Sequence, residues 1–291
     1  MGLTVMGLTV MGLTVMGLTV MGRWPATEAE LVVAQVRLAE EARSAPPWEL
    51  ASDRVHLIVG GCFLAFARGE AGPGAPGDRG WAGAVVWRPA RGVAGAGKAR
   101  GTGSALKGSG PELPRQARDV AEQSVVYGTV PAPYKAGLLA LREGALLEKA
   151  VRSLSHRPEV LLVDATGQDH PRKAGLVVHL GAMLGLPSVG VTHRPLLARG
   201  GMPALERGAT SPLSIDGSVV AYWVCTRSRA RPVVAHAGWR TSPETAAAVV
   251  LASSSEAART PIPLVEARRA AREARAVAEG RVQPTATDFR P

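Results

Sequence analysis

The chain has 291 residues, of which 46% are hydrophobic, and this is enough for one domain with a sizeable core. Its 34 Lys and Arg residues outnumber the 24 Asp and Glu residues, and the net charge of +10 favours a polyanionic partner such as nucleic acid. Aromatic residues make up only 4% of the chain, which argues against the broad base-stacking platform of a general single-strand binder.

The chain begins with a repeat. Residues 1–20 are four copies of MGLTV, and Met21 and Gly22 follow them. A glycine in every fifth position weakens a membrane-spanning helix, and the segment lacks the basic flank and the cleavage site of a signal peptide. We interpret residues 1–22 as a tandem expansion at the start codon that lies outside the fold. A membrane anchor and a disordered arm are the alternatives.

The first element predicted after the repeat is a helix over residues 27–42. Thr27 and Glu30 have the spacing of a capping box, which sets the start of the helix. Apolar residues recur at helical spacing and predict a buried face that consists of Leu31, Val32, Val36 and Leu38.

Two apolar segments, residues 55–66 and 81–87, are predicted to form a hairpin at one side of a sheet. Residues 88–115 are rich in Gly, Ala, Arg and Lys without periodicity and read as a flexible basic insertion. Within them, residues 92–99 nearly match a phosphate-binding loop, but Ala99 lacks the hydroxyl that binds Mg²⁺ and no helical pattern follows. We therefore do not expect a nucleotide-binding loop there.

Strands and helices alternate in the rest of the chain, which predicts parallel strands with helices packed on the faces of the sheet. Ser242 and Pro243 have the types expected at the cap and first position of a late helix, and residues 281–291 read as a disordered tail. The pattern predicts a single α/β domain over residues 23–280, built on a mixed sheet flanked by helices. The remaining predicted strands are 122–130, 160–164, 188–192, 219–226 and 232–237, and the remaining helices are 136–154, 173–185 and 264–279.

The segment VDATGQDHPRKAG, residues 163–175, joins a predicted strand to a helix. A carboxylate at the carboxyl end of a buried strand faces the crevice where open α/β folds bind ligands, and a helix N-terminus attracts anions. Asp164 is therefore a candidate for phosphate chemistry, and a turn or cap residue is the alternative interpretation. On this turn alone, an enzyme of small phosphorylated substrates remains open.

Together with PYKAGLLALREG, residues 133–144, this segment resembles the endonuclease V family, whose members carry a PYxPG segment ending in RE, then VDGxGxxHPR, then GVAK. The resemblance runs from Trp24 to about Arg275. It implies a ribonuclease H-like mixed sheet, and nicking of DNA or RNA near a deaminated purine such as inosine. It also implies that Glu143 and Asp164 hold Mg²⁺, with Mn²⁺ as the alternative ion. A solvated helix carboxylate is the alternative interpretation of Glu143.

Three positions depart from the family pattern. Phe63 stands where the first strand carries an aspartate, Trp239 replaces a histidine, and His193 replaces the lysine of GVAK. We keep His193 as a catalytic candidate, a protonatable donor to phosphate, and consider Asp169 and His170 as substitute metal ligands. Since a phenylalanine cannot coordinate a cation, a nucleic-acid-binding protein of the same fold that has lost catalysis is the rival hypothesis.

The resemblance also implies contacts with nucleic acid. Tyr134 matches a wedge that enters the duplex, with a core aromatic as the alternative, and the methyl group of Ala165 is expected to crowd a flipped base. Arg172 belongs to a turn that would bind phosphate, with a capped helix start as the alternative. The expected contacts are Pro133, Tyr134, Lys135, Ala165, Gly167, His170, Arg172 and Arg240.

The last predicted helix carries both signs of charge, and we interpret its arginines as a solvated face. Cys62 and Cys225 lie in strand-like segments without the spacing of a disulfide framework or a zinc site, which predicts a reducing, cytoplasmic location. We expect a monomer that has no obligate protein partner and does not bind membranes. The arginines of the last predicted helix are Arg268, Arg269, Arg272 and Arg275.

Overall fold

The computed structural model describes residues 22–50, 57–69, 74–89 and 120–281. The MGLTV copies, nearly all of the predicted insertion and the tail after residue 281 lie outside the described residues. The boundaries predicted for the domain and the character of these segments therefore stay predictions.

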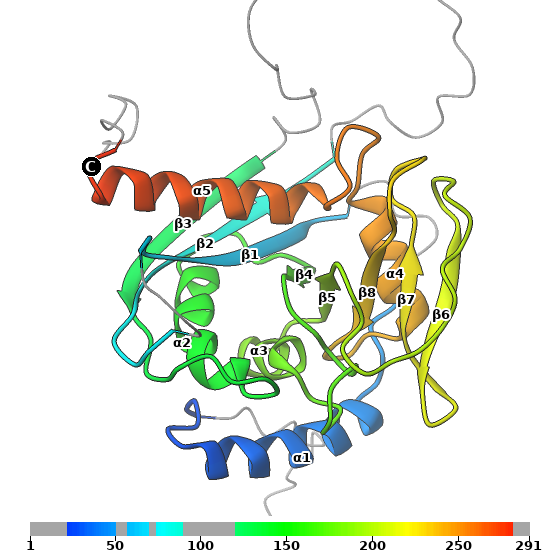
Figure 1. Ribbon diagram of the computed structural model, residues 1–291, viewed down its shortest axis with the longest axis horizontal. Coiled ribbons are helices and arrows are strands. Elements are labelled where there is room, and N and C mark those ends of the chain that lie inside the picture. The colour runs from blue at the N-terminus through cyan, green and yellow to red at the C-terminus, as the bar shows by residue number, and fades with distance from the viewer. Residues whose placement is uncertain (1–21, 51–56, 70–73, 90–119, 282–291) are drawn as a thin grey trace, which may run out of the picture.

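An eight-stranded mixed sheet forms the centre of the fold (Figure 1). Its strand order is β3-β2-β1-β4-β5-β8-β7-β6. Strands β1, β4 and β5 are parallel, β2 pairs with β1 as the predicted hairpin, and the remaining pairs are antiparallel. The prediction of a mixed α/β sheet is confirmed. The strands are β1 Val59–Phe66, β2 Arg79–Trp87, β3 Val120–Thr129, β4 Val160–Val163, β5 Ser188–Thr192, β6 Thr210–Ile215, β7 Ser218–Val224 and β8 Val233–Ala237.

Five helices among the described residues cover this sheet on both faces. Helices α2 and α3 pack on one face, α5 lies across the other, and α1 lies outside α3 (Figure 1). Both predicted caps are confirmed, since Thr27 accepts a hydrogen bond from the Glu30 amide and Ser242 accepts one from the Thr245 amide. The helices are α1 Glu28–Ser44, α2 Leu139–Arg152, α3 Leu176–Leu184, α4 Pro243–Ala252 and α5 Ile262–Ala278.

The structure corrects three details of the prediction. Helix α3 begins at Leu176 instead of residue 173, because Lys173 has a φ of 54° and belongs to a turn. Strand β6 was not predicted, since Pro212 and polar neighbours interrupt its alternation. In α1 the predicted core residue Val36 is 51% exposed, whereas Gln35 is buried.

Helix α5 approaches the sheet closely because two glycines lie beneath it. A Cβ atom at Gly61 of β1 would lie 2.3 Å from the Pro263 carbonyl oxygen, and one at Gly83 of β2 would lie 2.5 Å from the Ala267 carbonyl oxygen. Side chains at these two positions would force the helix away. The glycines thus bring the first turns of α5 against the middle of β1 and β2.

Both cysteines are buried, and neither forms a disulfide. Within the described part of the chain, no helix combines the length and the apolar character needed to cross a membrane.

Candidate active site

The carboxyl ends of β4 and β5 bring together two of the residues expected to carry chemistry. Asp164 directly follows β4 and His193 directly follows β5, which is parallel to β4. The ends of parallel strands meet at one edge of a sheet, and the negative charge of Asp164 acts on the imidazole of His193. Both groups thus lie at the edge of the sheet where the parallel strands end.

Glu143 reaches the same edge from helix α2. Burial raises the pKa of Glu143 to about 7, the charge of Arg142 lowers it, and the charge of Asp164 raises it further. Burial raises the pKa of the Cys62 thiol on β1, and the same two carboxylates raise it as well. The charge of Asp164 therefore acts on a Glu143 carboxylate that is largely removed from solvent. We call Asp164, Glu143 and His193 the strand-end site.

Phe63 and Arg268 complete the surroundings of Asp164. Because Cys62 is paired with Val163 in the parallel register of β1 and β4, the next residues, Phe63 and Asp164, lie side by side. The Arg268 guanidinium of α5 donates to Asp164 Oδ2 at 2.8 Å and lies 5.0 Å from the centre of the Phe63 ring. An arginine thus occupies the neighbourhood of the carboxylate that the resemblance assigns to a metal.

Arg268 was missed by the sequence analysis, which interpreted it as part of a solvated face. Nothing in the local sequence distinguishes it from Arg269, and only the packing of α5 on β1 and β4 turns it toward Asp164. The aromatic residue at position 63 is the one available signal, since a guanidinium stacks readily on such a ring.

Arg142, the neighbour of Glu143, holds the start of α2 in place. Its guanidinium is buried and donates to Asp78 Oδ2 and to the Ala132 carbonyl, each at 2.6 Å, while it lies 4.3 Å over the Phe66 ring. A buried arginine with these partners fixes the helix that presents Glu143. Arg142 belongs to the RE pair of the sequence, from which no role for it could be predicted.

His193 is exposed, and three arginines act on its ring. Partial burial lowers the pKa of His193, the charge of Arg259 lowers it further, Asp164 opposes this, and Arg268 and Arg231 add to the lowering. The imidazole is therefore held neutral near pH 7. This favours a proton acceptor over the cationic phosphate donor that the sequence suggested.

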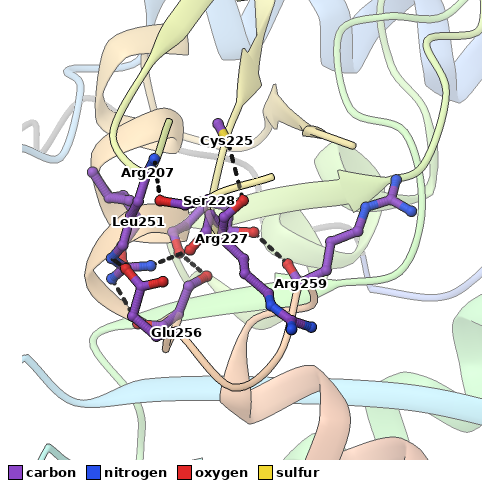
Figure 2. Close-up of polar contacts among 10 residues, drawn as sticks. Arg207, Cys225, Arg227, Ser228, Leu251, Glu256 and Arg259 are labelled. Carbon is purple, nitrogen blue, oxygen red and sulfur yellow. Dashed lines mark hydrogen bonds and ion pairs between the residues drawn. The ribbon is translucent and has the colours of Figure 1, made fainter. Parts of the chain in front are cut away.

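Figure 2 shows the polar contacts around Arg259, one of the arginines that act on His193. Thr226 Oγ1 donates to the Arg259 carbonyl at 2.6 Å, and the Arg259 guanidinium donates to the Pro232 carbonyl at 3.1 Å. Arg207 donates to the Thr226 carbonyl and, at 2.9 Å, to the Ser254 carbonyl. Arg207 thereby ties the turn after β7 to the segment between α4 and α5.

Asp169 is part of the interior and not a substitute metal ligand. Its carboxylate accepts backbone hydrogen bonds from Leu196, Leu197 and Ala198 at 2.7–2.8 Å, and its side chain is fully buried. The expectation that Asp169 approaches a metal is wrong, because these donors occupy its oxygens.

His170 and Arg172 both bind the carbonyl oxygen of Gly137. His170 Nε2 lies 3.0 Å from this oxygen and Arg172 Nη2 lies 2.9 Å from it, while Gln35 of α1 donates to it at 3.1 Å. Arg172 Nε also donates to Gln35 Oε1. The HPR turn therefore clamps the loop before α2, and His170, which is 3% exposed, has no free edge for a metal.

That loop carries the residues expected to enter a duplex. Pro133, Tyr134 and Lys135 are exposed, and Tyr134 is 52% exposed, so it is not a core aromatic. Lys135 forms an ion pair with Glu28 at the start of α1. The loop is anchored at Gly137 and displays its tip to solvent.

Ala165 and Gly167 are buried behind Asp164. The methyl group of Ala165 belongs to the core between β4, α2 and α3. A Cβ atom at Gly167 would lie 2.0 Å from the Ala237 carbonyl oxygen, so only glycine fits this turn. In this arrangement both residues shape the turn after β4.

Trp239 and Arg240 hold the end of β8. Trp239 is buried in a cluster with Leu38 of α1 and Val178 of α3, and so fills space between the helices. Arg240 Nε donates to the Pro46 carbonyl at 3.2 Å, and the Arg240 carbonyl accepts from the Trp48 amide. These contacts tie the segment after α1 to β8.

No group of three or more His, Cys, Asp or Glu side chains in the described ranges is arranged to hold a metal ion. The strand-end site offers two carboxylates, Glu143 and Asp164. Mg²⁺ is commonly bound by one or two carboxylates together with water and substrate phosphates, so this pair fits that ion. Burial, and after it the charge of Asp164, disfavours the ionised form of Glu143, and a divalent cation would offset both effects.

Comparison with known families gives one consistent result. The family model described as Endonuclease V matches residues 112–269, which is more than half of the chain. The Endonuclease V of Methanopyrus kandleri is 42% identical over 128 residues, which make up 44% of this chain and 55% of that protein. Across the first such relatives the match spans about half to two thirds of their own length.

Solved structures agree in fold. The crystal structure of the Endonuclease V from Streptomyces avermitilis superposes with a TM-score of 0.68 at 26% identity, over 90% of this chain and 98% of that one. The Endonuclease V of Ciona intestinalis, crystallised with a 24mer DNA that contains an inosine followed by a ribo-adenosine, gives a TM-score of 0.60 at 19% identity, over 84% and 96% of the two chains.

Proposed function

The chain belongs to the endonuclease V family, and from that premise we propose that it is a metal-dependent phosphodiester hydrolase that nicks DNA or RNA near a deaminated purine such as inosine. The Ciona intestinalis relative, which was crystallised with inosine-containing DNA, supports the choice of substrate. The net charge of +10 suits a nucleic-acid partner.

The observation that carries the proposal is the meeting of Asp164 and Glu143 at one edge of the sheet, where each lies in the field of the other. Carboxylates that repel each other in a partly buried place destabilise the fold unless a cation or a proton lies between them. We propose that these two side chains hold Mg²⁺, or Mn²⁺ as the alternative. When bound, the ion would polarise the scissile phosphate and acidify a water molecule.

The residues of the chain would divide the remaining work. His193, neutral near pH 7, would accept a proton from the attacking water. Arg268 would leave Asp164 and donate to a non-bridging phosphate oxygen, since an arginine suits that geometry. Arg142 would keep Glu143 in place without touching substrate.

The loop that displays Tyr134 would enter the nucleic acid next to the altered base. Its exposed tip, Pro133 to Lys135, and its anchoring by His170 and Arg172 at Gly137 support this role. A rigidly held loop loses little entropy when it inserts. We assign His170 and Arg172 to positioning this loop, and Ala165 and Gly167 to shaping the turn beneath the base. We also propose a cytoplasmic monomer, in line with the two unbridged cysteines.

The ion pair between Arg268 and Asp164 favours a second function. With Phe63 in place of an acid and a guanidinium on the remaining aspartate, the site would bind nucleic acid without cleaving it. Such a protein would keep salt-dependent affinity and would not respond to divalent ions.

The test is cleavage of labelled single- and double-stranded oligonucleotides with one deoxyinosine or inosine, in Mg²⁺, in Mn²⁺ and in chelator. Metal-dependent nicking by the wild type that Asp164→Asn abolishes is the expected result. Asp216→Asn makes the same change in the exposed turn between β6 and β7, serves as the matched control and should still nick. Binding without nicking under either ion would refute the hydrolase and leave the second function.

A further inference from the structure

Helix α5 has two charged sides. On one side arginine and glutamate charges compensate each other, and on the other side arginines predominate. On one side Arg269 pairs with Glu266 at 2.7 Å and with Glu273 at 3.2 Å, and these partners outweigh burial and raise the pKa of Arg269. On the other side Arg268, Arg272 and Arg275 follow one another at i, i+4 and i+7. Only the first side is the solvated, self-compensated face that the sequence suggested.

The three arginines of the second side lie along the end of strand β1. The guanidinium carbons of Arg268 and Arg272 lie 5.0 and 5.8 Å from the centre of the Phe63 ring, and Arg275 Nη1 donates to the Phe66 carbonyl at 2.9 Å. Arg68 follows β1 and is exposed. We call Arg68, Arg268, Arg272 and Arg275 the arginine track, which begins at Asp164 of the strand-end site.

Positive charge accumulates along this track. Burial lowers the pKa of Arg272, and the charges of Arg268, Arg275 and Arg68 lower it further. Burial and then Arg68 also lower the pKa of Arg275.

Few acids offset these charges. Asp164 pairs with Arg268 at one end of the track, and at the other end Glu279 accepts a hydrogen bond from the Arg68 amide and pairs with Arg281. Among the described side chains, no carboxylate forms an ion pair with Arg272 or Arg275. An anionic ligand would relieve this crowding.

We infer that the arginine track binds successive phosphates of the nucleic-acid strand on one side of the strand-end site. From Arg268 to Arg275 the helix rises about 10 Å, so the three guanidinium groups are spread widely enough to contact more than one phosphate of a strand. Phosphates are common to DNA and RNA, so the track serves either. The inference rests on the proposed function only in taking nucleic acid as the partner, and it does not require cleavage.

The experiment measures binding of a labelled single-stranded oligonucleotide in chelator, by fluorescence anisotropy across a series of salt concentrations. Arg272→Gln should bind about fivefold more weakly at ~0.1 M salt, equal to about 1 kcal/mol, and the slope of log affinity against log salt should fall by about 0.7. Arg272→Lys keeps the charge and should restore most of both. Arg269→Gln makes the same charge change on the paired side and should bind like the wild type.

Wild-type affinity and slope in Arg272→Gln would overturn the inference, as would an equal loss in Arg269→Gln, which would indicate net charge alone. Arg272 is exposed, and a thermal melt of each variant separates loss of binding from loss of fold. Weaker binding by Arg272→Gln in a protein that never nicks would keep the track and reject the hydrolase. Nicking by the wild type, together with unchanged binding by Arg272→Gln, would support the hydrolase and reject the arginine track.

Discussion

Asp164 and Asp169 belong to the same turn after β4, yet their carboxylates are in opposite states. Asp169 is fully buried, and backbone amides of Leu196, Leu197 and Ala198 donate to it at 2.7–2.8 Å. Asp164 is about a third exposed and has one described partner, the side chain of Arg268. A carboxylate whose oxygens are filled by backbone donors belongs to the fold, whereas one that pairs with a single side chain remains available to a ligand.

The largest expected effect comes from removing the buried carboxylate. Asp169→Ala leaves three backbone amides without acceptors and His236 without a charged neighbour, and we expect the free energy of unfolding to fall by about 3–5 kcal/mol. Urea denaturation measures the loss. Asp164→Ala is the matched comparison and should lose less than about 1 kcal/mol, because an ion pair at a part-exposed site contributes little. Equal losses in the two variants would contradict this division of roles.

The same contrast explains how far the sequence predicted the site. The position of Asp164 at the end of a buried strand could be predicted, because it needs only a local strand pattern. That pattern did not separate Asp164 from Asp169. The donors that fill Asp169 lie 27 to 29 residues away, and the arginine on Asp164 lies 104 residues away. Partners so distant leave no trace in local periodicity.

As with the site, the sequence predicted those parts of the fold whose signal is local. Apolar strands and capped helices such as α4 carry their signal locally, and these elements are where the sequence predicted them. Strand β6 and the left-handed Lys173 depend on tertiary pairing and on turn geometry. In α1 Gln35 points inward in place of Val36 because it binds the Gly137 carbonyl and Arg172. A hydrophobicity pattern does not contain this information.

Acid should destabilise the fold through a buried histidine of helix α3. His179 is fully buried and stacks on Trp24 at 4.6 Å, and burial lowers its pKa to about 4, with a further lowering by Arg37. Between pH 6.5 and 4 the unfolded chain binds a proton at this residue that the folded chain does not. Stability is therefore full above pH 6.5 and falls as the pH drops through that window.

At pH 5 this histidine alone should cost about 2 kcal/mol relative to pH 7. His179→Phe keeps the stacking on Trp24 and removes the titration, so the drop in unfolding free energy between pH 7 and 5 should be smaller by that amount. Urea denaturation at the two pH values gives the difference, and all other titrating groups are shared by the two proteins. Identical pH dependence in both would show that His179 takes up its proton within the fold.

The last prediction turns the strand-end site into a fuller carboxylate cluster. Phe63→Asp adds an acid beside Asp164, because the two positions are neighbours in the register of β1 and β4, and it removes the ring on which Arg268 and Arg272 lie. We expect Mn²⁺ to bind about tenfold more tightly, equal to about 1.4 kcal/mol, when measured by calorimetric titration.

Phe63→Leu is the control for this change, since it removes the ring without adding a ligand. If both variants gain affinity equally, release of Arg268 from its aromatic neighbour sets metal binding, and the missing acid does not. If only Phe63→Asp gains, the substitution at this one position is what distinguishes the site from a three-carboxylate centre. In both cases Asp169 should contribute nothing to the metal affinity, because backbone donors already fill its oxygens. The contrast between Asp164 and Asp169 therefore extends from stability to ligand binding.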